Sequence, residues 1–178
     1  MTLTHQDALA DALQRLKEQL QQAGAPSPVG FTADTRLVDG FQTTAQVRQF
    51  SFAVDEPPQL GGTDTGPNPV ELVLAALGTC QEIVYATYGR LLGIPIDALA
   101  IRVSGDLDLR GFLGAADVPA GYRAIDFDVA IESPASAEEV ALLIETVNRR
   151  CPVLDILQRG LPVAGHYALN GVSLETAA

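Results

Sequence analysis

Basic residues are scarce in this sequence, and this scarcity limits the partners that the protein can bind. The 178 residues include only 11 lysines and arginines but 22 aspartates and glutamates, which gives a formal net charge of −11. A chain with so few basic side chains cannot build the positive patch that phosphate groups require. We therefore expect neither nucleic acid nor an anionic membrane surface as a partner.

Cysteine and histidine are also rare. The N-terminus is polar and lacks a basic region, so we expect no secretory signal and a cytoplasmic location. In that setting the two cysteines, Cys80 and Cys151, indicate core thiols or a redox pair rather than a disulfide scaffold. His5 and His166 have no partner at metal-ligand spacing, and zinc needs three or four converging ligands. No metal site is therefore expected.

Motifs of several common enzyme classes are missing. The loop 55–68, DEPPQLGGTDTGPN, is rich in glycine and proline but has no lysine after its glycines, unlike a phosphate-binding loop. The chain has neither a dinucleotide fingerprint nor a serine nucleophile elbow, so we expect no cofactor. Hydrophobic residues make up 47% of the chain, which suits one globular domain with a sizeable core.

The most informative stretch that is present is a long apolar helix over 68–93. Asn68 is an expected N-cap, Pro69 stands at the first helical position, Glu71 can close a capping box, and Gly93 ends the helix. The helix is apolar on most of its circumference, which predicts burial on more than one side. Polar residues interrupt it, so we do not expect it to span a membrane. Cys80 lies at its middle.

The remaining pattern predicts an α+β fold with a largely antiparallel sheet. Residues 4–22 form an amphipathic helix that packs on the domain or, alternatively, makes a dimer contact. The break that follows divides the chain into an N-terminal helix and linker, 1–28, and a main domain, 29–178. Further strands are predicted at 29–54, with a turn at Asp39–Gly40, and at 98–108, 124–133 and 161–172.

Two helices are predicted near the second cysteine. Ser136 and Glu139 form a capping box that starts a helix over 136–149. Cys151 stands at the N-cap position of a short helix that ends before Gly160. The positive end of that helix would favour a thiolate at Cys151, whereas Cys80, in the middle of a helix, would need a nearby cation.

Three motifs together resemble the OsmC/Ohr family of osmotically inducible and organic-hydroperoxide-resistance proteins. They are DEPPQLGG, then GPNPVELVLAALGTC, and then CPV about seventy residues later, within residues 36–163. The resemblance implies the OsmC-like fold, an intertwined homodimer in which antiparallel sheet wraps around two central helices. It places the active sites at the subunit interface. The apolar helix, which one chain must cover, favours the same assembly.

The resemblance also implies an activity, the reduction of organic or lipid hydroperoxides. Cys80 would attack the peroxide and become a sulfenic acid, and Cys151 would condense with it to a disulfide. A dithiol, lipoyl-linked in known members, would then reduce both cysteines. We therefore expect the two cysteines to lie close enough to pair, with Cα atoms within about 7 Å.

The resemblance outweighs the helix-dipole argument for Cys151, because an arginine can supply the charge that Cys80 needs. Arg48 is the first candidate and Arg36 the second. Four apolar residues are expected to line the substrate pocket: Leu77, Val84, Phe50 and Phe52.

One position departs from the family pattern. Val70 stands where known peroxidases have a glutamate that holds the arginine, and Glu71 points about 180° away from Cys80. Asp55 or Glu56 could hold the arginine instead. Two other functions therefore stay open: a stress or ligand-binding protein that keeps the fold and thiols without peroxidase activity, and a thiol-dependent transfer that uses one cysteine.

Overall fold

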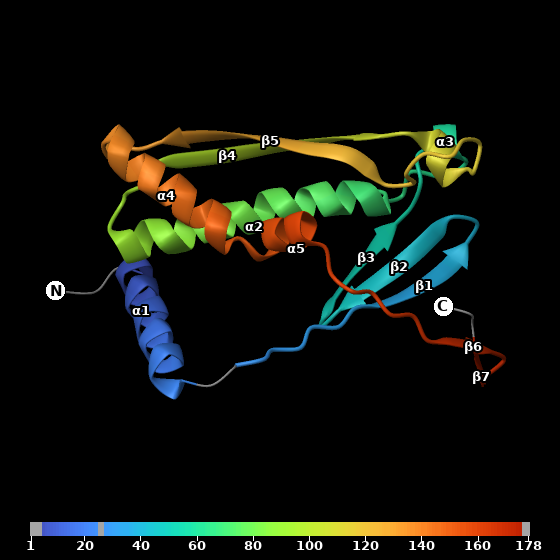
Figure 1. The fold of residues 1–178 in the computed structure, drawn as a ribbon, viewed down its shortest axis with the longest axis horizontal. Coiled ribbons are helices and arrows are strands. Elements are labelled where there is room, and N and C mark those ends of the chain that lie inside the picture. Colours follow the sequence, from blue (N-terminus) through green and yellow to red (C-terminus); the bar gives the residue numbers. More distant parts are fainter. Residues whose placement is uncertain (1–4, 25–26, 176–178) are drawn as a thin grey trace.

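The computed structural model describes residues 5–24 and 27–175, and its architecture is α+β, as the sequence predicts (Figure 1). All strand pairs in the described residues are antiparallel, in three separate sheets: β1–β2–β3, β4–β5 and β6–β7. The helix α2 (Pro69–Leu92) runs along the centre of the molecule. The β4–β5 ribbon covers one side of it, and α4 and α5 cover another.

Both ends of α2 carry the predicted signals. The Asn68 side chain accepts a hydrogen bond from the Glu71 amide, and the Glu71 carboxylate accepts one from the Asn68 amide, each at 2.9 Å. At the other end Gly93 has φ 71°, a left-handed conformation that favours glycine. These local hydrogen bonds determine where α2 starts and stops, and therefore where Cys80 lies along it.

The ribbon of β4 (Ala98–Leu107) and β5 (Tyr122–Glu132) supplies one wall of the core. Its side chains alternate between a half-buried face that packs on the core and an exposed face. The ribbon lies very close to α2 at Gly78, where an added Cβ would be 3.3 Å from Val103 Cγ2. The turn between the strands contains the short helix α3 (Leu109–Phe112).

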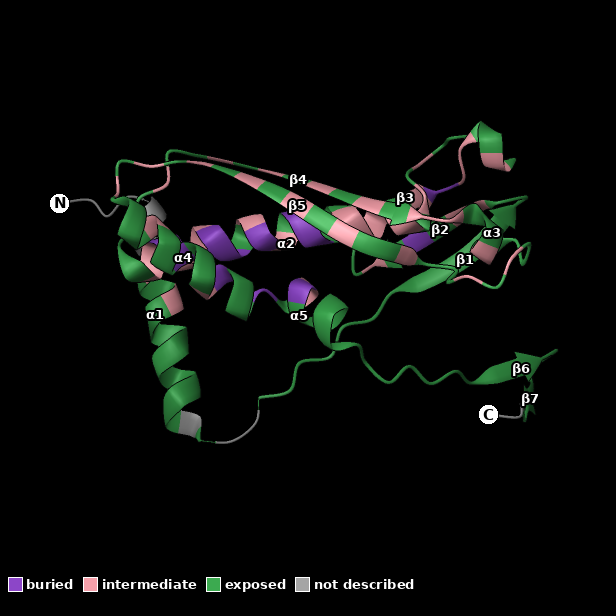
Figure 2. Cartoon of the chain, turned by 45° about the horizontal axis from the view of Figure 1, so that its top comes forward, coloured by how far each residue is buried: buried purple, intermediate pink, exposed green. Residues whose placement is uncertain are grey.

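The helices α4 (Ala137–Arg150) and α5 (Pro152–Arg159) complete the core. The predicted capping box of Ser136 and Glu139 is confirmed at the start of α4. Leu143 and Val147 of α4 are completely buried. Figure 2 shows buried residues along α2 and on the parts of α4 and α5 beside it, with a smaller buried group at β2 and β3. The main core cluster comprises Leu77, Val84, Tyr85, Ile94, Leu143, Val147, Cys151 and Leu154.

The sheet of β1 (Asp34–Asp39), β2 (Gln42–Val47) and β3 (Phe50–Val54) contributes no residue to that cluster. The predicted turn at Asp39–Gly40 is confirmed, but the sequence interpretation missed a second hairpin at Arg48–Gln49, where Arg48 has φ 54°. Several large apolar side chains remain exposed on and beside this sheet: Leu37, Val38, Phe41, Phe50 and Phe52. The surface of the β1–β2–β3 sheet is thus incompletely covered within a single chain.

The sequence predicted the structure of the N-terminal end correctly but not that of the C-terminal end. The N-terminal helix is confirmed as α1 (His5–Ala23), and its leucines Leu9, Leu16 and Leu20 are exposed. The single strand predicted over 161–172 is wrong. The chain forms two short strands there, β6 (Tyr167–Leu169) and β7 (Val172–Leu174). Asn170 and Gly171 both have positive φ, as a tight hairpin turn requires.

The helix α2 is long and apolar enough to cross a membrane by length and composition alone. This is weak evidence, because the core helix of a globular domain meets the same criterion. Here α2 supplies Leu77, Val84 and Tyr85 to the core, and its exposed positions include Ala76, Thr79 and Ile83. The face with these exposed positions lies next to Cys80 on the helical circumference.

Candidate thiol site

Cys80 and Cys151 are brought together from segments that lie 71 positions apart in sequence. The Cys151 thiol donates a hydrogen bond to the Cys80 sulfur, with the two sulfur atoms 3.5 Å apart. Both are free thiols, since a disulfide needs about 2.05 Å. The expectation that the two cysteines lie close enough to pair is therefore confirmed. Cys80 is positioned by the middle of α2, and Cys151 by the junction between α4 and α5.

The two thiols differ in exposure. Cys151 is 1% exposed and belongs to the main core cluster, whereas Cys80 is only partly buried and packs at the edge of that cluster. On the circumference of α2, Cys80 lies between the side that meets α4 and α5 and the exposed side of Ala76 and Ile83. Cys80 is consequently the thiol that an external molecule can reach.

The electrostatic expectation for Cys151 is wrong. Cys151 does stand at the N-cap of α5, but burial raises the pKa of its thiol above the ordinary value, and the neighbouring Cys80 raises it further. The backbone amides of Leu154 and Val153 oppose this effect without reversing it. A helix of only two turns offers less stabilisation to a thiolate than the loss of water costs. The buried thiol is therefore held as S–H.

The lining predicted for the substrate pocket divides into two groups. Leu77 and Val84 lie in the cluster that contains Cys151. Phe50 and Phe52 lie on β3, 53% and 41% exposed, outside that cluster. Arg48, at the tip of the same hairpin, places its guanidinium 5.3 Å from the centroid of the Phe50 ring. Within a single chain, Arg48, Phe50 and Phe52 therefore lie apart from the thiols.

Asp55, one of the two acidic residues suggested for the arginine, is not free to hold it. Asp55 is 2% exposed, and its carboxylate accepts hydrogen bonds from the hydroxyls and amides of Thr63 and Thr65 and from the amide of Glu56. The hydrogen bond from the Thr63 side chain, with those from the backbone amides, holds the pKa of Asp55 well below its usual range. Glu56 accepts a hydrogen bond from Asn68 at 3.2 Å. The suggestion that Asp55 holds the arginine is wrong, because the Asp55 carboxylate holds together the 55–68 loop instead.

Glu71 has the local role that helix geometry favoured. Its carboxylate closes the capping box of α2, and it is exposed. Val70, at the position of the family glutamate, is partly buried and lines a cavity of about 440 Å³ together with Tyr122 of β5 and Leu60 of the 55–68 loop. No acidic side chain replaces the glutamate at that position of the helix.

Sequence reasoning missed Gln81, which is 0% exposed although it is polar. Neither Oε1 nor Nε2 of its amide has a hydrogen-bond partner in the described part of the chain. An unsatisfied buried polar group costs about 1–3 kcal/mol of stability. The signal for its burial was present in the sequence, since Gln81 lies four positions from both Leu77 and Tyr85 on one stripe of α2.

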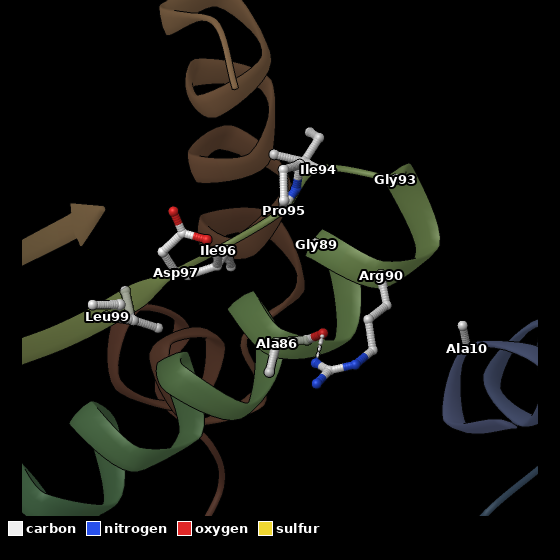
Figure 3. A pocket seen from close by; sticks show the side chains of 11 residues that line it. Ala10, Ala86, Gly89, Arg90, Gly93, Ile94, Pro95, Ile96, Asp97 and Leu99 are labelled. Carbon is white, nitrogen blue, oxygen red and sulfur yellow. Dashed lines mark hydrogen bonds between the residues drawn. The ribbon is translucent and has the colours of Figure 1, made fainter. Parts of the chain in front are cut away.

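A larger cavity, of about 600 Å³, lies between the C-terminal end of α2, the start of β4 and Ala10 of α1 (Figure 3). The Arg90 side chain folds back along α2 there, and its Nη1 donates a hydrogen bond to the Ala86 carbonyl at 2.7 Å. Arg90 thereby stabilises the negative end of the α2 dipole. Neither this cavity nor the one at Val70 is lined by a cysteine.

No cation within residues 5–24 and 27–175 makes a hydrogen bond or ion pair to either sulfur. The same residues contain no cluster of three or more histidine, cysteine, aspartate or glutamate side chains suited to a metal ion. His166 is exposed, and the side chain of His5 lies outside the described residues. The distinctive chemistry of the site is thus that of two adjacent thiols with unequal exposure.

Comparisons with known proteins agree with this geometry. A family model described as OsmC-like protein matches residues 62–164. A protein of Haloferax volcanii with no assigned function is 30% identical over 120 residues, which are 67% of this chain and 81% of that protein. A crystal structure of an OsmC-like protein from Mycoplasma pneumoniae is 25% identical with a TM-score of 0.64, and the match covers 74% of this chain and 89% of that one.

Solved structures of hydroperoxide-resistance proteins share the fold at lower identity. One from Legionella pneumophila is 17% identical with a TM-score of 0.58, and the match covers 76% of this chain and 93% of that one. Another, from Elizabethkingia anophelis, is 19% identical with a TM-score of 0.54, covering 76% and 92%.

Proposed function

Since this chain belongs to the OsmC-like protein family, we propose that it is a thiol-dependent peroxidase that reduces organic or lipid hydroperoxides with Cys80 and Cys151. Two structural relatives are organic hydroperoxide resistance proteins, which supports this reaction class. The observation that carries the proposal is the 3.5 Å separation of an accessible and a buried thiol.

The unequal exposure of the thiols supports the proposed order in which they react. The Cys80 sulfur attacks the distal oxygen of the hydroperoxide, an S–O bond forms, the O–O bond breaks, and the alkoxide takes up a proton and leaves as an alcohol. The Cys151 sulfur then attacks Cys80, so that an S–S bond forms and the oxygen leaves as water. An external dithiol, such as a lipoyl group, returns the two electrons and restores both thiols.

A second copy of the chain supplies the missing positive charge in this proposal. Arg48, Phe50 and Phe52 share one exposed patch, because Phe50 and Phe52 alternate onto the same face of β3 and Arg48 lies over Phe50. In a homodimer this patch can cover the exposed face of α2 beside Cys80. The guanidinium then favours the thiolate of Cys80, and the two rings line an apolar pocket suited to a fatty hydroperoxide.

A second function is favoured by one specific observation, the absence of the arginine–glutamate pair. Val70 replaces the family glutamate, and both acidic residues of the neighbouring loop have other partners. With Arg48 unheld, the chain would be an OsmC-like stress or ligand-binding protein that keeps reduced thiols without peroxide turnover. Both functions suit the reducing cytoplasm, which is the location that we propose.

Turnover by the reduced protein tests the proposal. We expect consumption of cumene hydroperoxide or a lipid hydroperoxide with dihydrolipoamide as reductant. Cys80→Ser should abolish it, and Cys151→Ser should allow a single oxidation of Cys80. Thr146→Ser on α4 is the matched control, since a serine keeps the hydrogen bond of Thr146 to the Leu142 carbonyl. A wild-type protein that consumes no hydroperoxide with any dithiol would favour the non-enzymatic function.

A further inference from the structure

Gln81 is a buried polar side chain to which the reaction described above gives no role. It has no accessible surface in a single chain, and both polar atoms of its amide lack a partner among the described residues. A second copy of the chain cannot supply one, because no surface of Gln81 is left for it to touch. Buried amides are nearly always hydrogen-bonded. A group that forms near Gln81 during the reaction can therefore supply the missing partner.

The position of Gln81 on α2 indicates which group this is. Leu77, Cys80, Gln81 and Val84 are spaced i, i+3, i+4 and i+7, and four residues with this spacing surround a hole on a helix surface. Cys151 packs in the same cluster as Leu77 and Val84, with its sulfur 3.5 Å from that of Cys80. Cys151 thus packs beside this hole, which Cys80 and Gln81 border on opposite sides.

Oxidation of Cys80 introduces a new polar group at this hole. A sulfenic acid has an oxygen that accepts and a hydroxyl that donates a hydrogen bond. Cys80 and Gln81 differ by about 100° around the helix and only about 1.5 Å along it, so an oxygen on the Cys80 sulfur and the long Gln81 side chain can meet only over the hole that both residues border. The other two residues around the hole, Leu77 and Val84, are apolar and offer no hydrogen bond.

We propose that Gln81 is a positioning residue for the sulfenic acid of Cys80, with its amide hydrogen-bonded to the sulfenic oxygen while Cys151 attacks. This inference rests on the proposed function. The Gln81 N–H group donates to the oxygen, and its carbonyl accepts from the S–OH hydroxyl. As the S–S bond forms and the S–O bond breaks, negative charge develops on the departing oxygen. The same N–H group stabilises that charge until the oxygen takes the Cys151 proton and leaves as water.

The test separates the oxidation of Cys80 from the formation of the disulfide. The chain has no tryptophan to report the change by fluorescence, so the two steps are followed by rapid quenching, dimedone trapping and mass spectrometry. In Gln81→Met, which keeps the length without the amide, we expect disulfide formation to slow about tenfold, equivalent to about 1.4 kcal/mol of activation free energy. The rate of Cys80 oxidation should change less than about twofold.

A conservative variant provides the rescue. Gln81→Glu should form the disulfide more slowly than the wild type at neutral pH, and this deficit relative to the wild type should shrink at acidic pH, where a protonated carboxyl group can donate and accept as the amide does. If Gln81→Met folds and forms the disulfide at the wild-type rate, or slows both steps equally, the proposal is overturned. If Gln81→Met does not fold, a pH profile of Gln81→Glu parallel to that of the wild type overturns it.

The outcome does not depend on turnover with an organic substrate. If the wild type is not oxidised by cumene hydroperoxide, the proposed function fails by itself. Excess hydrogen peroxide forms the same sulfenic acid at Cys80, so the comparison between wild type and Gln81→Met can still be made, and it supports or overturns the role of Gln81 by the same criteria.

Discussion

A disulfide bond between Cys80 and Cys151 should stabilise the folded protein, and the structure determines the size of the gain in stability. The bond closes a loop of 71 residues, for which the chain-entropy relation predicts about 4 kcal/mol. The sulfur atoms must approach from 3.5 Å to about 2.05 Å, which α2 and the α4–α5 junction have to accommodate. We therefore expect a gain in the free energy of unfolding between about 2 and 4 kcal/mol.

The measurement compares urea unfolding of the reduced protein with that of protein oxidised by diamide, at one protein concentration. Diamide forms the disulfide without peroxide, so the result does not depend on peroxidase activity. In thermal unfolding the same gain corresponds to roughly 4–16 °C. Cys151→Ser treated with diamide is the control and should show no gain in the unfolding midpoint.

One result would refute the reasoning. If mass spectrometry shows the intramolecular disulfide in the oxidised protein but the midpoint is unchanged or lower, closing the bond must strain the fold. The thiols would then be less suitably placed than their separation indicates.

Four further predictions concern the charges and the assembly. Arg48→Ala should slow the oxidation of Cys80 by a hydroperoxide about 10- to 100-fold in single-turnover assays, whereas Arg36→Ala should leave this rate unchanged. Equal oxidation rates in the two variants would contradict the role of Arg48. Because burial raises the pKa of Cys151, disulfide formation should keep accelerating above about pH 8.5, and a plateau below that pH would contradict it. The lowered pKa of Asp55 means that its stabilising contribution is present above about pH 4 and lost as the pH falls below it. Protease cleavage within residues 55–66 should therefore be faster in Asp55→Asn than in wild type at pH 7, with a smaller difference in strong acid. Sedimentation should give twice the chain mass for the wild type, and Phe52→Asp, on the exposed patch, should yield monomers; a monomeric wild type at micromolar concentration would exclude the dimer.

The elements around the site were largely predictable from the sequence. Asn68, Glu71 and Gly93 determine the bounds of α2 through hydrogen bonds within four residues, and Ser136 does the same for α4. Such bonds do not depend on the rest of the fold. Where local signals were overlooked, at Arg48–Gln49 and Asn170–Gly171, the interpretation missed a hairpin.

The properties of the thiols could not be predicted in this way. The resemblance of motifs predicted that Cys80 and Cys151 lie close together, but no local signal joins positions 71 apart. The N-cap position of Cys151 suggested an acidic thiol, yet burial by α2 and α4 raises its pKa instead. Electrostatics at a site depends on all the atoms that exclude water from it, most of which are distant in sequence.

The sequence by itself determined where the capped helices α2 and α4 begin and which two cysteines are present. Tertiary structure decided that these cysteines lie 3.5 Å apart, that only Cys80 remains accessible, that Arg48 projects from an exposed hairpin, and that Gln81 is enclosed without a partner. The physical reason is one of range. Caps and turns depend on hydrogen bonds between near neighbours, whereas distance, burial and pKa depend on how α2, α4, α5 and the β4–β5 ribbon pack together.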